Sequence, residues 1–203
     1  NVYAAGEFYN VGADHLNRYV AKWDGNSWQE LGSGSNVLAA NDNIQSVATD
    51  RAGNVYAAGN FKDESYTYYY VAKWNGSTWS ELGNLNANST IYALATDALG
   101  NVYAAGSFTD NNGKIYVAKW NGSSWQALGD PISSNLGAGY SFIRKIAFDD
   151  QGNIYVTGNI TDANNKYYVA KLNGNTWAPL GSGSAALNAN GAILGLSVRA
   201  SNN

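Results

Sequence analysis

The sequence predicts an all-β protein made of four similar units of about fifty residues each. The hexapeptide Asn-Val-Tyr-Ala-Ala-Gly starts at Asn1 and recurs at Asn54 and Asn101, and Asn-Ile-Tyr-Val-Thr-Gly starts at Asn153. The spacings are therefore 53, 47 and 52 residues. Short segments rich in Val, Ile, Tyr and Trp, bounded by Gly, Asn and Asp, favour strands over helices. Internal similarity of this extent indicates one repeat domain over residues 1–203.

Each unit is predicted to contain four strands, A to D. In the second unit, strand A covers Ile44–Thr49, strand B Val55–Phe61, strand C Tyr70–Trp74 and strand D the stretch around Trp79–Leu82. The A–B link, Asp50–Asn54, has an Asp that can bond its own backbone and a Gly for the positive-φ position. An Asn-Gly or Asp-Gly pair joins C to D in every unit, which is a strong hairpin signal.

Four-stranded meanders at this period are typical of the blades of a β-propeller. The fold class predicted is therefore all-β, a β-propeller of four four-stranded blades. The segment Ile193–Arg199 aligns with a strand A, whereas the unit that starts at Asn1 lacks one. We expect this C-terminal strand to pair with Val2–Phe8, so that residues 193–203 complete the first blade and close the ring. The alternative is a slice of a longer array, cut at a repeat boundary.

A family resemblance accompanies these motifs. The run Asp-x-x-Gly-Asn-Val-Tyr-Ala-Ala-Gly-x-Phe, followed by Val-Ala-Lys-Trp-Asn-Gly-x-x-Trp-x-x-Leu-Gly, resembles the kelch-like and NHL-like propeller repeats of secreted bacterial proteins, especially Bacteroidetes surface proteins. The resemblance covers the whole chain. It implies secretion and display at the cell surface, but not a function, because one fold serves many functions.

Composition excludes several function classes. Charged residues make up only 13% of the chain, the net charge is −3, and the 12 Lys and Arg are scattered, so nucleic-acid binding is not expected. No apolar run approaches the roughly 18 residues of a membrane-spanning helix, so membrane insertion is not expected either. With no Cys and one His, thiolate metal sites and a Ser-His-Asp triad are excluded, and we expect neither metal nor cofactor.

The connections between strands differ in how much they vary between units. In a meander, the A–B and C–D turns lie on one face of the disc, and the B–C and D–A loops lie on the other. The turns are nearly identical, whereas the loops diverge, and loops on a rigid scaffold are where binding residues concentrate. The alternative is that unconstrained loops simply drift. The B–C loops are Tyr9–Arg18, Lys62–Tyr69, Thr109–Ile115 and Thr161–Tyr167.

An acidic or amide residue recurs at one position of these loops, often with an aromatic nearby. Planar acceptors and donors beside an apolar ring are what a sugar requires. The alternative is that each Asp or Asn closes its own loop as an Asx-turn. The candidate ligand-binding residues are Asn10, Asp14, His15, Asp63, Tyr66, Asp110, Asn111, Asn112, Asp162, Asn164 and Asn165.

These features lead to a non-enzymatic, secreted or cell-surface propeller that binds a glycan or a surface protein. A first alternative is a self-associating building block of a surface layer, sheath or filament, because a surface of low charge permits close packing. A second is a glycan-active enzyme, which would require two carboxylates in one pocket. The recurring Lys of strand C, such as Lys73, is expected to form an ion pair with an Asp that ends strand A, such as Asp50.

Overall fold

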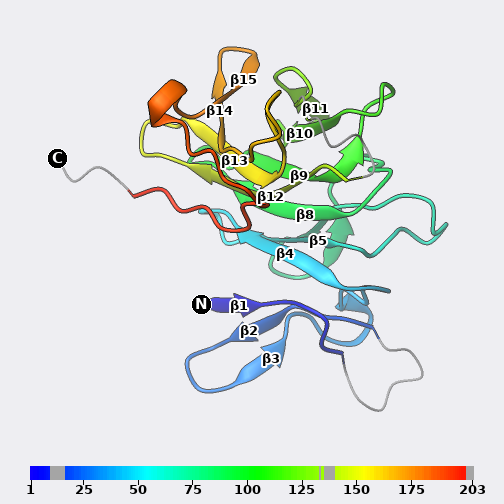
Figure 1. Ribbon diagram of the computed structural model, residues 1–203. Helices are drawn as coiled ribbons and strands as arrows, with labels where there is room; N and C mark the ends of the chain where they lie inside the picture. Colours follow the sequence, from blue (N-terminus) through cyan, green and yellow to red (C-terminus); the bar gives the residue numbers. More distant parts are fainter. Residues whose placement is uncertain (10–16, 133, 135–139, 200–203) are drawn as a thin grey trace.

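The computed structural model describes residues 1–9, 17–132, 134 and 140–199, and this part of the chain forms four antiparallel sheets (Figure 1). The first sheet has three strands, and the other three have four each. Both described helices are single 3-10 turns, Gly34–Asn36 and Gly183–Ala185, and neither could cross a membrane. The strands are β1 (Val2–Ala4), β2 (Ala21–Trp23) and β3 (Trp28–Glu30); β4 (Ile44–Thr49), β5 (Val55–Gly59), β6 (Ala72–Trp74) and β7 (Trp79–Glu81); β8 (Ile91–Thr96), β9 (Val102–Thr109), β10 (Ile115–Trp120) and β11 (Trp125–Leu128); β12 (Phe142–Phe148), β13 (Ile154–Asn159), β14 (Ala170–Asn173) and β15 (Thr176–Pro179).

Each four-stranded sheet is a meander in which neighbours in sequence are neighbours in space. The predicted A strands at Ile44–Thr49 and Ile91–Thr96 are confirmed, whereas strand C of the second unit begins at Ala72 rather than Tyr70. The pairing of strands A and B shifts register near the start of strand A. In the sheet β8–β11, Ile91 pairs with Gly106 but Ala93 pairs with Ala105. This bulge repeats in all three four-stranded sheets. We call these sheets, and the three-stranded one, blades 1 to 4 in chain order.

The hydrophobic core lies between blades rather than within one of them. One cluster joins Val20 and Leu31 of blade 1 to Val55 and Phe61 of blade 2. Similar clusters join blade 2 to blade 3 and blade 3 to blade 4. Strand β5 is buried along its whole length, as expected for a strand covered on both faces. Each blade therefore depends on its neighbours for burial.

Tryptophan side chains tie consecutive blades together with a repeated hydrogen bond. The indole nitrogen of Trp79 donates to the carbonyl oxygen of Leu31 in the preceding blade at 2.9 Å. Trp125 donates in the same way to Leu82, and Trp177 donates to Leu128 at 3.1 Å. Because a buried indole N–H needs an acceptor, this bond helps to set the register of one blade on the next.

The described residues do not show the predicted pairing of Ile193–Arg199 with the N-terminal strand. Strand β1 pairs with β2 alone, and residues 192–199 contain no strand, so blade 1 has three strands rather than four. The backbone N–H of Ile193 donates instead to Gly158 of blade 4 at 3.0 Å. Figure 1 shows why: the blue sheet β1–β3 lies at the bottom and the yellow to orange sheet β12–β15 at the top. The terminal segment stays with blade 4.

A glycine at the A–B bulge provides a test of this packing. A Cβ atom at Gly106 would overlap the carbonyl oxygen of Thr90, and Gly59 and Gly158 occupy the same position in their blades. We expect Gly106→Ala to lower the free energy of unfolding by about 1–3 kcal/mol, because the bulge cannot open without shifting the backbone. Urea unfolding measures this loss. A matched control is Gly191→Ala, whose Cβ meets nothing within 4 Å; equal stability of the two variants would contradict the packing described.

Candidate functional site

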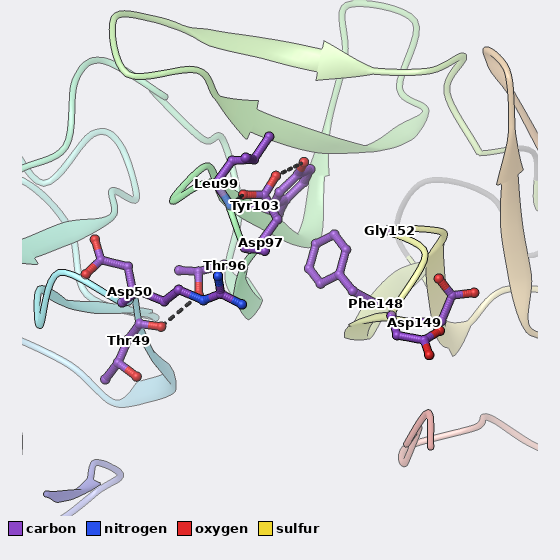
Figure 2. Close-up of a pocket in the computed structure, with 12 residues that line it drawn as sticks. Thr49, Asp50, Thr96, Asp97, Leu99, Tyr103, Phe148, Asp149 and Gly152 are labelled. Carbon is purple, nitrogen blue, oxygen red and sulfur yellow. Dashed lines mark hydrogen bonds between the residues drawn. The ribbon is translucent and has the colours of Figure 1, made fainter. Parts of the chain in front are cut away.

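Three A–B turns surround a pocket of about 750 Å³, which we call the turn pocket (Figure 2). Its wall combines carboxylates with the apolar side chains of Phe148 and Leu99, and Leu99 is 88% exposed. This pocket lies on the face of nearly identical turns, where the sequence did not predict a site. Its residues are Thr49, Asp50, Arg51, Thr96, Asp97, Ala98, Leu99, Tyr103, Phe148, Asp149, Asp150 and Gly152.

The carboxylates of the turn pocket are held by a network that repeats in each blade. Asp97 accepts hydrogen bonds from the backbone and side chain of Asn101 and, at 2.9 Å, from the hydroxyl of Tyr103. Asp50 and Asp149 have equivalent partners. Partial burial of Asp97 opposes ionisation, but these hydrogen bonds outweigh it and hold the pKa of the carboxyl below its usual value. These carboxylates therefore stabilise the A–B turns.

The strand C lysine does not form the predicted ion pair with these carboxylates. Lys73 Nζ lies 6.0 Å from the centre of the Tyr56 ring, and Lys119 lies 5.4 Å from that of Tyr103. The tyrosine stands between the two charges: its hydroxyl reaches the aspartate while its ring faces the lysine. A cation–π contact has replaced the expected ion pair. The sequence pattern pointed to the right two groups but missed the aromatic between them.

The network should give the fold a measurable pH dependence. Because the pKa of Asp97 is lowered by folding, its contribution to stability is present above the ordinary aspartate pKa of about 3.9 and is lost as the pH falls through the lower, folded value. We expect Tyr103→Phe to raise that pKa and to cost about 1 kcal/mol at pH 7. NMR titration of the carboxyl and urea unfolding would measure both effects. Tyr92→Phe is the control, since the Tyr92 ring packs on Phe142; an unchanged Asp97 pKa in Tyr103→Phe would refute the network.

The predicted loop aspartates close their own loops. Asp110 Oδ1 accepts hydrogen bonds from the backbone N–H groups of Asn112 and Lys114, both at 2.9 Å. Asp162 does the same with Asn164 and Lys166. Hydrogen bonds, first of all that from the Lys114 backbone, lower the pKa of Asp110 and keep it ionised. These hydrogen bonds are those expected of Asx-turns. The role of these residues in binding a ligand stays a prediction.

The remaining candidates lie at loop tips and do not converge on one site. Asn111, Asn112 and Asn164 are exposed. Tyr66 and Asn165 have positive φ values of 57°, so both are turn residues as well as exposed side chains. Blades 2 to 4 each present their own set beside a separate pocket. Asn10, Asp14 and His15 lie outside the described residues.

Loops of blades 2 and 3 form a pocket of about 510 Å³, which we call the loop pocket. Two predicted residues, Asp110 and Asn111, line it together with Tyr68, which is 42% exposed. Burial and the Asp110 charge raise the pKa of Tyr116, whose hydroxyl therefore stays protonated at neutral pH. The complete lining is Tyr68, Asn86, Asn88, Thr109, Asp110, Asn111, Tyr116, Ala127 and Pro131.

Tyr68 comes from the β5–β6 loop of blade 2, and Asn86 and Asn88 come from the connection between β7 and β8. The sequence did not predict these three residues, because the pocket lies between repeats rather than within one. Asn88 ties this connection to blade 3: its side-chain amide donates to Thr109 O at 3.2 Å and accepts from Thr109 N at 2.9 Å. Asn41 holds Lys62 of the next blade in the same way. The recurrence of Asn41 and Asn88 after Ala in adjacent units was a signal that could have been used.

A second loop pocket, of about 420 Å³, is lined by three carboxylates, two of which have displaced pKa values. Asp63 and Glu81 line it with Glu64, Ser65 and Tyr70. Desolvation, and then the Asp63 charge, raise the pKa of Glu81, whereas hydrogen bonds led by that from the Ser65 hydroxyl lower the pKa of Asp63. Within the described residues, no group of three or more His, Cys, Asp or Glu is arranged to hold a metal ion.

Comparisons with known proteins agree with the repeat architecture. The sequence of residues 128–165 matches the family described as Beta-propeller repeat (SBBP). This segment runs from β11 through the A and B strands of blade 4 into its B–C loop. No curated protein matches the chain. The repeats, the antiparallel four-stranded sheets and this match support a β-propeller repeat architecture.

Three solved structures similar to the chain share only 12–15% of its sequence. A fucose lectin from Kordia zhangzhouensis in complex with methyl-fucoside is 15% identical with a TM-score of 0.42, over 70% of this chain and 99% of that one. YCF48 bound to D1 peptide is 12% identical, with a TM-score of 0.47 over 79% of this chain and 46% of that one. A protein of unknown function from Dyadobacter fermentans is 12% identical, with a TM-score of 0.48 over 80% and 58% of the two chains. The chain thus spans about half the length of the latter two.

Proposed function

We propose that this chain is a secreted or cell-surface β-propeller that binds a glycan, without catalysis, in the loop pocket between blades 2 and 3. The observation that carries the proposal is the meeting of an exposed tyrosine ring with charged and amide side chains from two different blades. A volume of about 510 Å³ lies within the usual range for small-molecule sites. A neutral surface rich in Asn, Ser and Thr motivates the extracellular location.

The chemistry of the lining suits a neutral, hydroxyl-rich ligand. Asp110 is ionised and uses Oδ1 for its own loop, so its other oxygen is the natural acceptor for a sugar hydroxyl. Tyr116 can donate, and Asn111 can do both. The exposed ring of Tyr68 offers an apolar face of the kind that packs against a pyranose. An anionic ligand would be repelled by Asp110.

The test is a glycan array probed with the 203-residue chain, followed by affinity measurements on the best ligand. We expect Tyr68→Ala and Asn111→Ala each to weaken binding at least tenfold, which corresponds to about 1.4 kcal/mol. The control is Leu99→Ala, a substitution of an exposed residue in the turn pocket on the opposite face. A blank array would argue against the proposal, and loss of binding in Leu99→Ala alone would move the site to the turn pocket.

The carboxylate pair of the second loop pocket is the specific observation that favours an enzyme instead. A glycoside hydrolase of the usual kind needs one protonated and one ionised carboxyl group, and Glu81 and Asp63 have pKa values displaced in those directions. However, Asp63 Oδ1 accepts hydrogen bonds from the Ser65 hydroxyl and the Thr67 backbone N–H, so this oxygen already stabilises its own loop. We therefore expect the bound glycan to be recovered intact after prolonged incubation. Chromatographic detection of cleavage that Glu81→Gln abolishes would establish catalysis.

A further inference from the structure

The loop pocket is one of three pockets, within the described residues, that occupy the same place in successive blades. In blade 3 it is lined by Asp110 of the B–C loop, Tyr116 near the start of strand C and Ala127 of strand D. The pockets of blades 2 and 4, of about 420 Å³ and 300 Å³, are lined by the residues at the same three positions of the repeat. Those residues are Asp63, Tyr70 and Glu81 in blade 2, and Asp162, Tyr168 and Pro179 in blade 4. Repetition of the blade has therefore repeated a pocket.

The tyrosine that these pockets share is held in the same way in blades 2 and 3. The ring of Tyr70 packs edge-on against Phe61 with 4.9 Å between the ring centroids, and Tyr116 packs against Phe108 at the same distance. Neither tyrosine hydroxyl forms a hydrogen bond within the described residues. A phenylalanine would make the same ring contact, yet every unit has a tyrosine here: Tyr19, Tyr70, Tyr116 and Tyr168. Packing therefore explains the ring but not the hydroxyl.

The loop aspartate provides an acceptor beside each tyrosine. In blades 2 and 3, the hydrogen bonds that close the loop use Oδ1 of Asp63 or Asp110 and lower the pKa of that carboxyl group. Burial, and then the charge of the loop aspartate, raises the pKa of both Tyr116 and Tyr168. Burial and the nearby carboxylates, Asp63 among them, raise the pKa of Tyr70 to about 12. A hydroxyl donor and a carboxylate acceptor thus lie near each other in each pocket, which suits a sugar hydroxyl.

The three pockets differ mainly at the strand D position. Its side chain is exposed in each blade and lies at the rim of the pocket. Glu81 adds a negative charge in blade 2, whereas Ala127 and Pro179 are uncharged. Because the aspartate and tyrosine stay constant while the rim varies, we expect the pockets to bind the same kind of sugar with different affinities.

We propose that this aspartate–tyrosine pair is a sugar-binding unit repeated in blades 2, 3 and 4, so that one chain holds a glycan at several points. The inference rests on the proposed function, since it extends the chemistry of the loop pocket to its two counterparts. Shared hydrophobic clusters fix the three blades to one another, so the sites belong to one scaffold. Once one site is occupied, a ligand that reaches a second site binds there at high effective concentration. The ligand class is therefore a glycan that presents the same sugar repeatedly.

Backbone amide NMR of the full chain, titrated separately with D-glucose, D-galactose and D-mannose, counts the sites. We expect one of these sugars to shift the signals of three loops, residues 62–69, 109–115 and 161–167. Tyr70→Phe should weaken binding roughly tenfold at its own loop and leave the loop of Asp110 unchanged, and Tyr116→Phe should do the reverse. Tyr92→Phe, whose ring packs on Phe142, is the matched control and should affect neither.

The outcomes of this titration separate the two proposals. Shifts confined to the loop of Asp110 would overturn the repeated unit and leave the proposed function intact. If none of the three sugars shifts any loop, both proposals are contradicted. Shifts in all three loops that each single variant removes only from its own blade would establish the repeated unit.

A second measurement tests whether one ligand bridges the sites. Calorimetry at low chain concentration should show that polyacrylamide carrying the bound sugar binds roughly 100-fold more tightly than the free sugar. The double variant Tyr70→Phe/Tyr116→Phe retains the blade 4 pocket, so it should still bind the free sugar but lose this gain. Equal affinity of the unmodified chain for the polymer and the free sugar would refute a repeated glycan as the ligand.

Discussion

The structure depends on the burial of both faces of every blade against its neighbours. A sheet such as β4–β7 carries apolar side chains on both faces. These side chains are buried only when another sheet packs against each face, so the sheet is stable only in a stack. Other features follow from this requirement. The small residues of β5 allow close approach, and the tryptophan and asparagine bonds fix how one blade sits on the next.

Polar groups near the tightly packed inner strands are handled by local networks rather than by ion pairs. The Asp–Asn–Tyr arrangement satisfies a partly buried carboxylate and a buried phenol together. Placing the tyrosine ring between aspartate and lysine avoids the desolvation of two bare charges at once, which is costly in a protein interior. Repetition of this network in blades 2 to 4 surrounds the turn pocket with carboxylates that are already engaged. The loop pocket, by contrast, has side chains from two blades with donors and acceptors still open to a ligand.

As a proposed binding site, the loop pocket shows how a repeat protein can gain a site without changing its blades. Asn88 ties the β7–β8 connection to Thr109 of blade 3, while Tyr68 and Asn111 lie in loops and line the pocket. Loops of this kind can vary with small effects on stability, because their backbone hydrogen bonds close within the loop itself. Under the proposed function, stability and recognition are carried by different residues, and each can change separately.

The sequence alone determined what depends on neighbours a few residues away. The strands at Ile44–Thr49 and Ile91–Thr96, the Asp-to-Asn turns and the self-closing loop at Asp110 involve partners within about six positions, so their patterns are visible in one repeat. The tertiary structure alone decided which residues of different blades meet. Tyr68 and Asp110 line one pocket although 42 positions separate them, and the terminal segment lies against Gly158 rather than β1. These outcomes depend on the angle and offset between stacked sheets, which a periodic sequence does not express.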